Sequence, residues 1–120
     1  MLFRSPDDCH VLNSRPLFEA LLEGIRTGVP AGKLALDFHV TIARASARIA
    51  SEICIREDLD TVALSGGVFM NRLLLRLLTH ELKSAGLTVL VPQTVPVNDG
   101  CIAYGQAAVA RTRLAQVAPQ

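Results

Sequence analysis

Aromatic side chains are scarce in this sequence, which has no tryptophan, one tyrosine and four phenylalanines among 120 residues. Proteins that bind single-stranded nucleic acid stack the bases on aromatic rings, so this scarcity argues against such a function. A basic excess is also missing, because 12 Lys and Arg are balanced by 11 Asp and Glu. A nucleic-acid interface needs a clustered basic face. We therefore expect no nucleic-acid partner.

Long apolar runs and paired cysteines are missing as well. No run approaches the roughly 18 apolar residues that a membrane-spanning helix needs. Arg4 and the pair Asp7-Asp8 interrupt the N-terminus where a signal peptide would be apolar. The three cysteines are widely spaced and form no Cys-x-x-Cys pair, so they indicate neither a zinc ribbon nor a disulfide framework. The composition predicts a soluble, cytoplasmic protein with reduced thiols and no membrane partner.

What the sequence does have is apolar residues, which make up 50% of it and give a mean hydropathy of +0.35. A small domain has a high ratio of surface to volume, so part of this apolar surface is expected to stay exposed unless a partner covers it. This composition predicts either a piece of a larger protein or a homodimer.

The chain divides into an irregular or flexible segment at 1–12 with a weak strand at 9–12, one domain at 13–116, and a tail at 117–120. Hydrophobic spacing and the positions of glycine and proline predict the elements of the domain. These are helices from residue 14 to Gly28 and from Pro30 to about Glu57, a strand at 61–64, a helix from Phe69 to Gly86, a strand at 87–91, and a helix at 102–116.

This order, ααβαβα, is an α/β fold with a short sheet, and a helix between two strands makes the strands parallel. The strand at 61–64 is rich in β-branched residues, which is typical of a buried parallel strand. The last helix is rich in alanine, whose small side chain should let the helix pack closely on the sheet. The second helix carries an apolar stripe with a face of small residues: Ala35, Phe38, Ile42, Ala45, Ile49 and Ile53.

The turn Ser65-Gly66-Gly67 joins the first strand to the helix that follows. Glycine lacks a Cβ, so a phosphate can approach the backbone, and the N–H groups at the start of a helix are unpaired donors. Two interpretations are open from local chemistry alone. The turn either holds a phosphate group or is only a tight connection between a strand and a helix.

A second cluster, Asn98-Asp99-Gly100, follows the second strand. Ligands of parallel α/β sheets bind beyond the carboxyl ends of the strands, where both clusters are expected to meet. Asp99 is then either a metal ligand or proton acceptor, or an ordinary helix N-cap. His39 lies beside the apolar stripe and is either near this edge of the sheet or a satisfied, partly buried histidine. No His-x-x-x-His metal pair and no Ser/His/Asp arrangement occurs, so no catalytic residue is assigned.

Two longer motifs carry a resemblance. Residues 61–74 (TVALSGGVFMNRLL) and 95–107 (VPVNDGCIAYGQA), with Phe38-His39 before them, resemble the carboxyl-terminal end of the HypF carbamoyltransferases, which mature NiFe hydrogenases. The resemblance covers about residues 13–114. It implies the Kae1-like domain, which has the actin-like ATPase, ribonuclease-H-like fold.

The resemblance also implies a site. The family binds ATP or carbamoyl-adenylate with a divalent metal and transfers the carbamoyl group to a cysteine of an acceptor protein. Nucleotide contacts would come from Ser65, Gly66, Gly67 and Val68, with Asn71 just inside the helix and Gly100 opposite. Asp99 would bind the metal beside the phosphates, and His39 is a candidate cleft residue.

The sequence departs from the family at Met70 and Cys101, where glutamine and glycine are usual. The family's other domains, including the half-domain with a His-x-x-x-His metal motif, do not fit in 120 residues. We therefore expect a truncated, nucleotide-binding lobe that is not active alone. Its partners would be the missing half-domain or an acceptor protein of hydrogenase maturation. The alternative is an inactive remnant that serves as a dimerising structural module.

Overall fold

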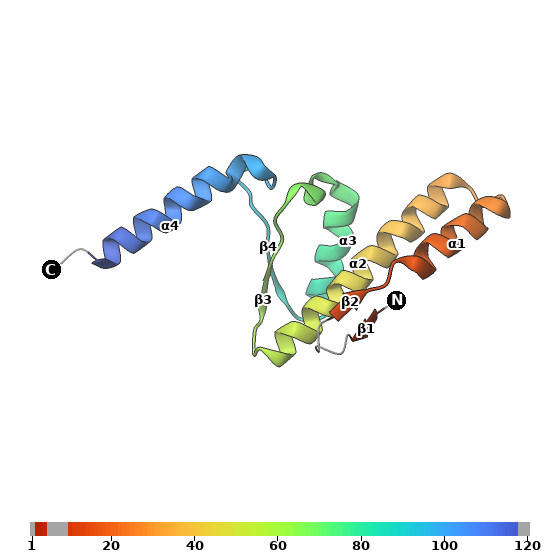
Figure 1. Ribbon diagram of the computed structural model, residues 1–120, viewed down its shortest axis with the longest axis horizontal. Coiled ribbons are helices and arrows are strands. Elements are labelled where there is room, and N and C mark those ends of the chain that lie inside the picture. The colour runs from red at the N-terminus through yellow and green to blue at the C-terminus, as the bar shows by residue number, and fades with distance from the viewer. Residues whose placement is uncertain (1, 5–9, 118–120) are drawn as a thin grey trace.

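The structure, a computed structural model, describes residues 2–4 and 10–117. It is elongated, with extents of 70 × 33 × 25 Å and a Cα radius of gyration of 18.4 Å; a compact domain of this length would have about 14 Å. Figure 1 shows its elements, which are β1 (Leu2–Arg4), β2 (His10–Leu12), α1 (Arg15–Arg26), α2 (Ala31–Arg56), β3 (Thr61–Ala63), η1 (Gly67–Met70), α3 (Arg72–Ser84), β4 (Thr88–Leu90), η2 (Asp99–Cys101) and α4 (Ile102–Val117).

The N-terminal strands β1 and β2 pair in antiparallel fashion, with Leu2 opposite Leu12 and Arg4 opposite His10. The weak strand expected at 9–12 is therefore present as β2, whereas β1 was not expected. Residues 1, 5–9 and 118–120 lie outside the described residues, so the predictions of a flexible start and a tail remain predictions there. From residue 13 onward the predicted order ααβαβα is confirmed, with the short 3-10 helices η1 and η2 added before α3 and α4.

The core lies where α2 and α3 pack against one face of the β3–β4 sheet. Its fully buried members are small on α2, at Ala43 and Ala47, and large on α3. Alanine on one helix lets the leucines of the other approach its backbone closely. The predicted small-residue face exists, but it is rotated from the predicted stripe, of which Ala45 alone is buried. The leucines of α3 that complete the core are Leu74, Leu78 and Leu82.

The strands β3 and β4 are parallel, as predicted, with Val62 opposite Val89 and Ala63 opposite Leu90. Side chains alternate between the two faces of a strand, and only Val62 and Val89 pack against the helices. On the other face Ala63 is exposed and Leu90 is 55% exposed. The interpretation of residues 61–64 as a buried strand is therefore wrong for this second face, because no described element covers it.

The last helix α4 projects away from the rest of the molecule (Figure 1), and residues 102–116 are all exposed. The expectation that it packs on the sheet is wrong in this structure, because α4 has its main contacts with η2 alone. Its apolar side chains Tyr104, Val109 and Leu114 are more than half exposed. None of the described helices has an apolar stretch long enough to cross a membrane.

Candidate functional site

The glycine turn after β3 has a backbone that requires glycine. Leu64 extends the sheet by donating its N–H to the carbonyl of Leu90 at 2.8 Å. Gly66 follows with φ 110° and ψ 155°, a combination that is essentially confined to glycine. The chain then enters η1, where the Phe69 N–H donates to the Gly66 carbonyl at 3.0 Å. A buried strand end and a half-buried phenylalanine hold the turn on both sides.

The turn leaves donors open to solvent. The Gly66 N–H donates to the Val97 carbonyl at 2.6 Å, whereas those of Gly67 and Val68 have no acceptor among the described residues. A Cβ built on Gly66 or Gly67 would meet no atom within 4 Å. There is therefore space in front of two unpaired N–H groups, which is what an anion needs.

The structure brings the two predicted clusters together at one edge of the sheet. The Gly66–Val97 hydrogen bond joins the loop after β3 to the loop after β4. A weaker contact lies beside it, in which the Asn98 amide nitrogen is 3.7 Å from the Met70 sulfur. This arrangement is the one expected from parallel strands that end on the same side.

Asp99 is not the cap of its helix. The N-cap of η2 is Asn98, whose Oδ1 accepts the Gly100 N–H at 3.1 Å. The interpretation of Asp99 as an N-cap is therefore wrong. Its exposed carboxylate has no hydrogen bond or ion pair with any described residue. Gly100 fits tightly here, since a Cβ would lie 3.1 Å from the same Asn98 oxygen.

The donor set suits a metal that arrives with phosphate, and not a metal held by protein alone. Among the described residues no three His, Cys, Asp or Glu side chains are grouped to hold an ion. Asp99 would supply one ligand. Magnesium is commonly held by one or two carboxylates together with phosphate oxygens and water, so the residues present fit a nucleotide-bound magnesium ion.

Asn71 has a different place from the one predicted. The helix expected from Phe69 begins at Arg72, because η1 occupies 67–70 and ends at Asn71. Asn71 is thus the N-cap of α3 and not a residue inside it. Its Oδ1 accepts the N–H groups of Leu73 and Leu74, each at 3.1 Å, which satisfies two donors that the first helical turn cannot pair internally.

His39 reaches this cap from α2. Its Nδ1 lies 2.6 Å from the Ala35 carbonyl oxygen and its Nε2 lies 2.8 Å from the Asn71 amide nitrogen. The ring also meets Phe38 edge to face, with 5.6 Å between the ring centroids. His39 is half-buried with both nitrogens paired, and it adjoins the site through Asn71.

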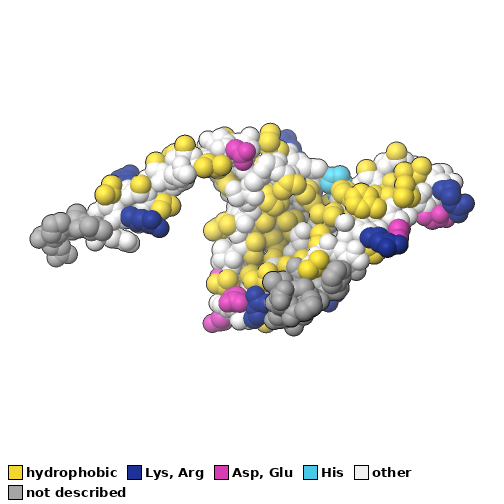
Figure 2. Space-filling view, in the orientation of Figure 1, with side chains coloured by type: hydrophobic (Ala, Val, Ile, Leu, Met, Phe, Trp, Pro, Cys, Tyr) yellow, Lys and Arg dark blue, Asp and Glu magenta, His cyan; other side chains and the backbone are white. Residues whose placement is uncertain are grey.

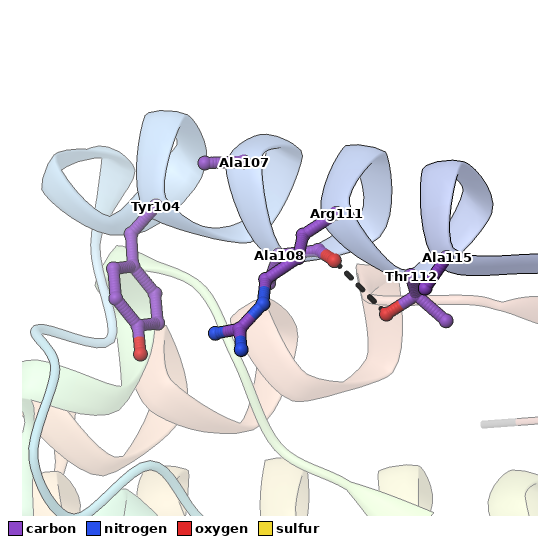
Figure 3. Close-up of a pocket in the computed structure, with 6 residues that line it drawn as sticks. All are labelled: Tyr104, Ala107, Ala108, Arg111, Thr112 and Ala115. Carbon is purple, nitrogen blue, oxygen red and sulfur yellow. Dashed lines mark hydrogen bonds between the residues drawn. The ribbon is translucent and has the colours of Figure 1, made fainter. Parts of the chain in front are cut away.

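A hollow of about 530 Å³ lies elsewhere, along α4. Figure 3 shows Tyr104 and Arg111 extending from the helix and the hydrogen bond from Thr112 to the Ala108 carbonyl, which is 3.1 Å long. All the residues that line it come from this one helix. It is therefore the open side of an uncovered helix, and a ligand would be held from one side only.

An exposed ion pair on α1 shifts the pKa values of its two members. On α1, hydrogen bonds from Arg26 lower the pKa of Glu23, and Glu23 in turn raises the pKa of Arg26. This pair is fully exposed, so it changes little in the fold. An ion pair between Arg44 and Glu81, 3.2 Å apart, links α2 to α3.

The fold and the site together define a class of α/β protein: a parallel β-α-β unit with a glycine turn and a carboxylate at the carboxyl edge of its sheet. Residues 2–106 match the family model of the second subdomain of the Kae1-like domain of carbamoyltransferases. The chain belongs to this family, the HypF carbamoyltransferases.

Sequence relatives support the assignment to this family. The chain is 40% identical over 118 residues to a carbamoyltransferase HypF homolog of Cupriavidus necator, covering 95% of this chain and 30% of the relative. It is 41% identical over 101 residues to carbamoyltransferase HypF of Rhizobium leguminosarum bv. viciae, covering 83% of this chain and 13% of the relative. The chain thus spans less than a third of either relative.

Solved structures show the same fold. A full-length HypF in its phosphate- and nucleotide-bound form superposes with a TM-score of 0.86 at 31% identity, over 95% of this chain and 15% of that one. HypF of T. kodakarensis superposes with a TM-score of 0.77 at 30% identity, over 97% of this chain and 15% of that one. The predicted α/β, Kae1-like architecture is confirmed.

Proposed function

We propose that this chain is the nucleotide-binding lobe of a HypF-type carbamoyltransferase and takes ATP or carbamoyl-adenylate with magnesium. The observation that carries the proposal is the hydrogen bond from Gly66 to Val97. It joins the glycine turn to the loop of Asp99. In these two loops the N–H groups of Gly67 and Val68 and the Asp99 carboxylate have no partners among the described residues. Donors for a phosphate and a ligand for its cation therefore belong to two neighbouring loops.

In this proposal the backbone N–H groups of Gly67 and Val68 donate to phosphate oxygens. Asp99 would hold a magnesium ion beside this site, and the metal would supply positive charge to neutralise the phosphate. Ser65, in the same turn, and Gly100, in the loop of Asp99, are both exposed. The site has one carboxylate, so the remaining groups for carbamoyl transfer to an acceptor cysteine come from another half-domain, consistent with the 15% of a full-length HypF that the chain spans. The setting would be cytoplasmic hydrogenase maturation.

Calorimetry with ATP and magnesium tests the lobe directly. We expect measurable binding that Asp99→Asn weakens by about tenfold or more. Loss of a residue that only supports a metal ligand lowers metal affinity by at least about tenfold, and loss of a direct ligand should lower it at least as much. Asp58→Asn is the matched control. It removes an exposed carboxylate before β3, at the opposite end of the strand, and its φ of 53° is one that Asn tolerates. Absence of binding at millimolar ATP, or equal affinities in both variants, would contradict the proposal.

A second candidate function, a self-associating structural module, is favoured by the uncovered apolar surface. Figure 2 shows hydrophobic side chains gathered over the middle of the molecule, where β3 and β4 lie in Figure 1. Leu90 on the sheet and Tyr104 and Leu114 on α4 are each more than half exposed. A second copy that buries this surface would gain about 25 cal/mol for each Å² removed from water.

Light scattering after size exclusion separates these candidates. If the structural module is the function, we expect a dimer at micromolar concentration that Leu90→Asp converts to a monomer, since a buried carboxylate in the interface is costly. Asp substituted for Thr88, on the same exposed strand face but already polar, should weaken the dimer less. A monomer over the whole accessible concentration range would contradict self-association and leave the nucleotide proposal intact.

A further inference from the structure

We propose that His39 is a positioning residue of the glycine turn: it orients the Asn71 amide, so that Asn71 caps α3 and holds the end of η1. This inference rests on the proposed function for its consequence, but its geometry is independent of it. The path runs from the Ala35 carbonyl through the His39 ring and the Asn71 amide to the N–H groups of Leu73 and Leu74.

Each hydrogen bond in this path has only one allowed direction. A backbone carbonyl can only accept, so the His39 nitrogen 2.6 Å from the Ala35 oxygen is Nδ1–H. In a neutral imidazole the other nitrogen is then an acceptor. His39 Nε2 therefore accepts a hydrogen bond from the Asn71 amide nitrogen at 2.8 Å. The Asn71 oxygen is left to face the two helix N–H groups, which can only donate.

This path removes the freedom of the Asn71 side chain. An asparagine amide can turn over about its last bond, exchanging oxygen and nitrogen with little change of shape. Without His39, nothing beyond the two helix donors would select between the orientations. With His39, the turned-over amide would place donor against donor at α3 and acceptor against acceptor at His39, losing all three hydrogen bonds.

The place of Asn71 gives the orientation a consequence for the site. Asn71 is the single residue between η1 and α3, and its N–H donates to the Val68 carbonyl at 3.1 Å. Fixing the cap therefore fixes where η1 ends and holds the backbone of Val68. The Asn71 oxygen accepts both helix N–H groups, and one hydrogen of its amide nitrogen is donated to His39. The backbone N–H groups of Gly67 and Val68, which are proposed to contact phosphate, are therefore held in place by the cap.

The test compares His39→Gln with His39→Asn. The glutamine amide extends to about where Nε2 lies, so its oxygen accepts from Asn71, whereas asparagine is too short. Amide hydrogen exchange is measured by NMR without nucleotide. We expect the Leu73 and Leu74 amides to exchange faster in His39→Asn, by up to about fivefold, and at the native rate in His39→Gln, because complete loss of an N-cap costs about that factor at the helix end.

A second measurement uses the unaltered chain and does not depend on a variant folding. The ¹⁵N shifts of the imidazole should show His39 in the Nδ1–H form. His80, which is exposed on α3 and has no partner among the described residues, is the control ring and should show the mixture of tautomers found in free histidine. His80→Asn should leave the exchange of Leu73 and Leu74 unchanged.

An Nε2–H form at His39, or unchanged exchange at Leu73 and Leu74 in His39→Asn, would overturn the inference. The nucleotide arm is separate: titration with magnesium and ATP should be about equally weakened in His39→Asn and Asn71→Ala and be native in His39→Gln. If the exchange pattern appears but no variant and no native chain binds ATP, the positioning role stands and the proposed function fails. If ATP binds and Asn71→Ala has native affinity while exchange is altered, the cap role stands without its consequence for the site, which overturns that step.

Discussion

Replacing Leu82 by alanine is expected to lower the free energy of unfolding by about 2–5 kcal/mol, the range for large-to-small changes in a well-packed core. The Leu82 side chain on α3 has 0% exposure and belongs to the cluster that joins α2, α3 and the sheet. The helices that flank it are tied to the strands on both sides, so they can collapse only partly into the space. Domains of this size have about 5–15 kcal/mol in total, so this one change would remove a substantial part of the stability.

Urea denaturation followed by circular dichroism measures this effect. Leu114→Ala is the matched control, because it removes the same atoms from a residue that is 72% exposed on α4. We expect the control to change the free energy of unfolding by less than about 0.5 kcal/mol. Equal losses in the two variants would contradict the description of α4 as an uncovered helix. Leu82→Met, which keeps the volume, should cost less than about 1.5 kcal/mol.

The second large effect is expected at Gly66. Alanine there must adopt φ 110° and ψ 155°, which costs about 1–3 kcal/mol for a residue with a side chain. No atom lies within 4 Å of the added Cβ, so the whole effect comes from the backbone and none from a clash. Relief of this strain would rotate the Gly66 N–H away from the Val97 carbonyl. We therefore expect Gly66→Ala to lower both stability and affinity for ATP with magnesium.

Gly67→Ala separates the two losses. Gly67 is also open on its Cβ side, and its φ lies outside the left-handed region. Alanine at this position should leave the free energy of unfolding within about 0.5 kcal/mol of native. Its methyl group stands beside the unpaired N–H groups, so ATP binding should still weaken. A Gly66→Ala variant as stable as Gly67→Ala would mean that the turn is not held in the conformation described.

The elements of the fold were predictable because their signals are local. Gly28 and Gly86, which follow α1 and α3, have φ of 75° and 82°, as a residue that ends a helix in the left-handed region should. The two strands could be placed from short apolar runs, and their parallel pairing follows from the helix between them. The start of α3 was misjudged by three residues, because Phe69 fits the apolar spacing of a helix but packs on the core from η1.

The site was predictable in part. The meeting of the glycine turn with the loop of Asp99 follows from the rule for parallel strands, and the Gly66–Val97 bond agrees with it. The contact between His39 and Asn71 was not predicted, because 32 residues separate them and it depends on how α2 is rotated about its axis. The same rotation decides that Ala43 and Ala47 are buried. Apolar spacing cannot fix such a rotation on a helix that has neighbours on two sides.

The attachment of α4 couples its orientation to the glycine turn. The 16 residues of this helix extend for about 24 Å from η2, and Val97, just before η2, accepts the hydrogen bond from Gly66. A tilt of about 10° at the attachment moves the far end of such a helix by about 4 Å. A molecule that holds the far end of α4 therefore constrains the angle at η2, and through Val97 it constrains the glycine turn.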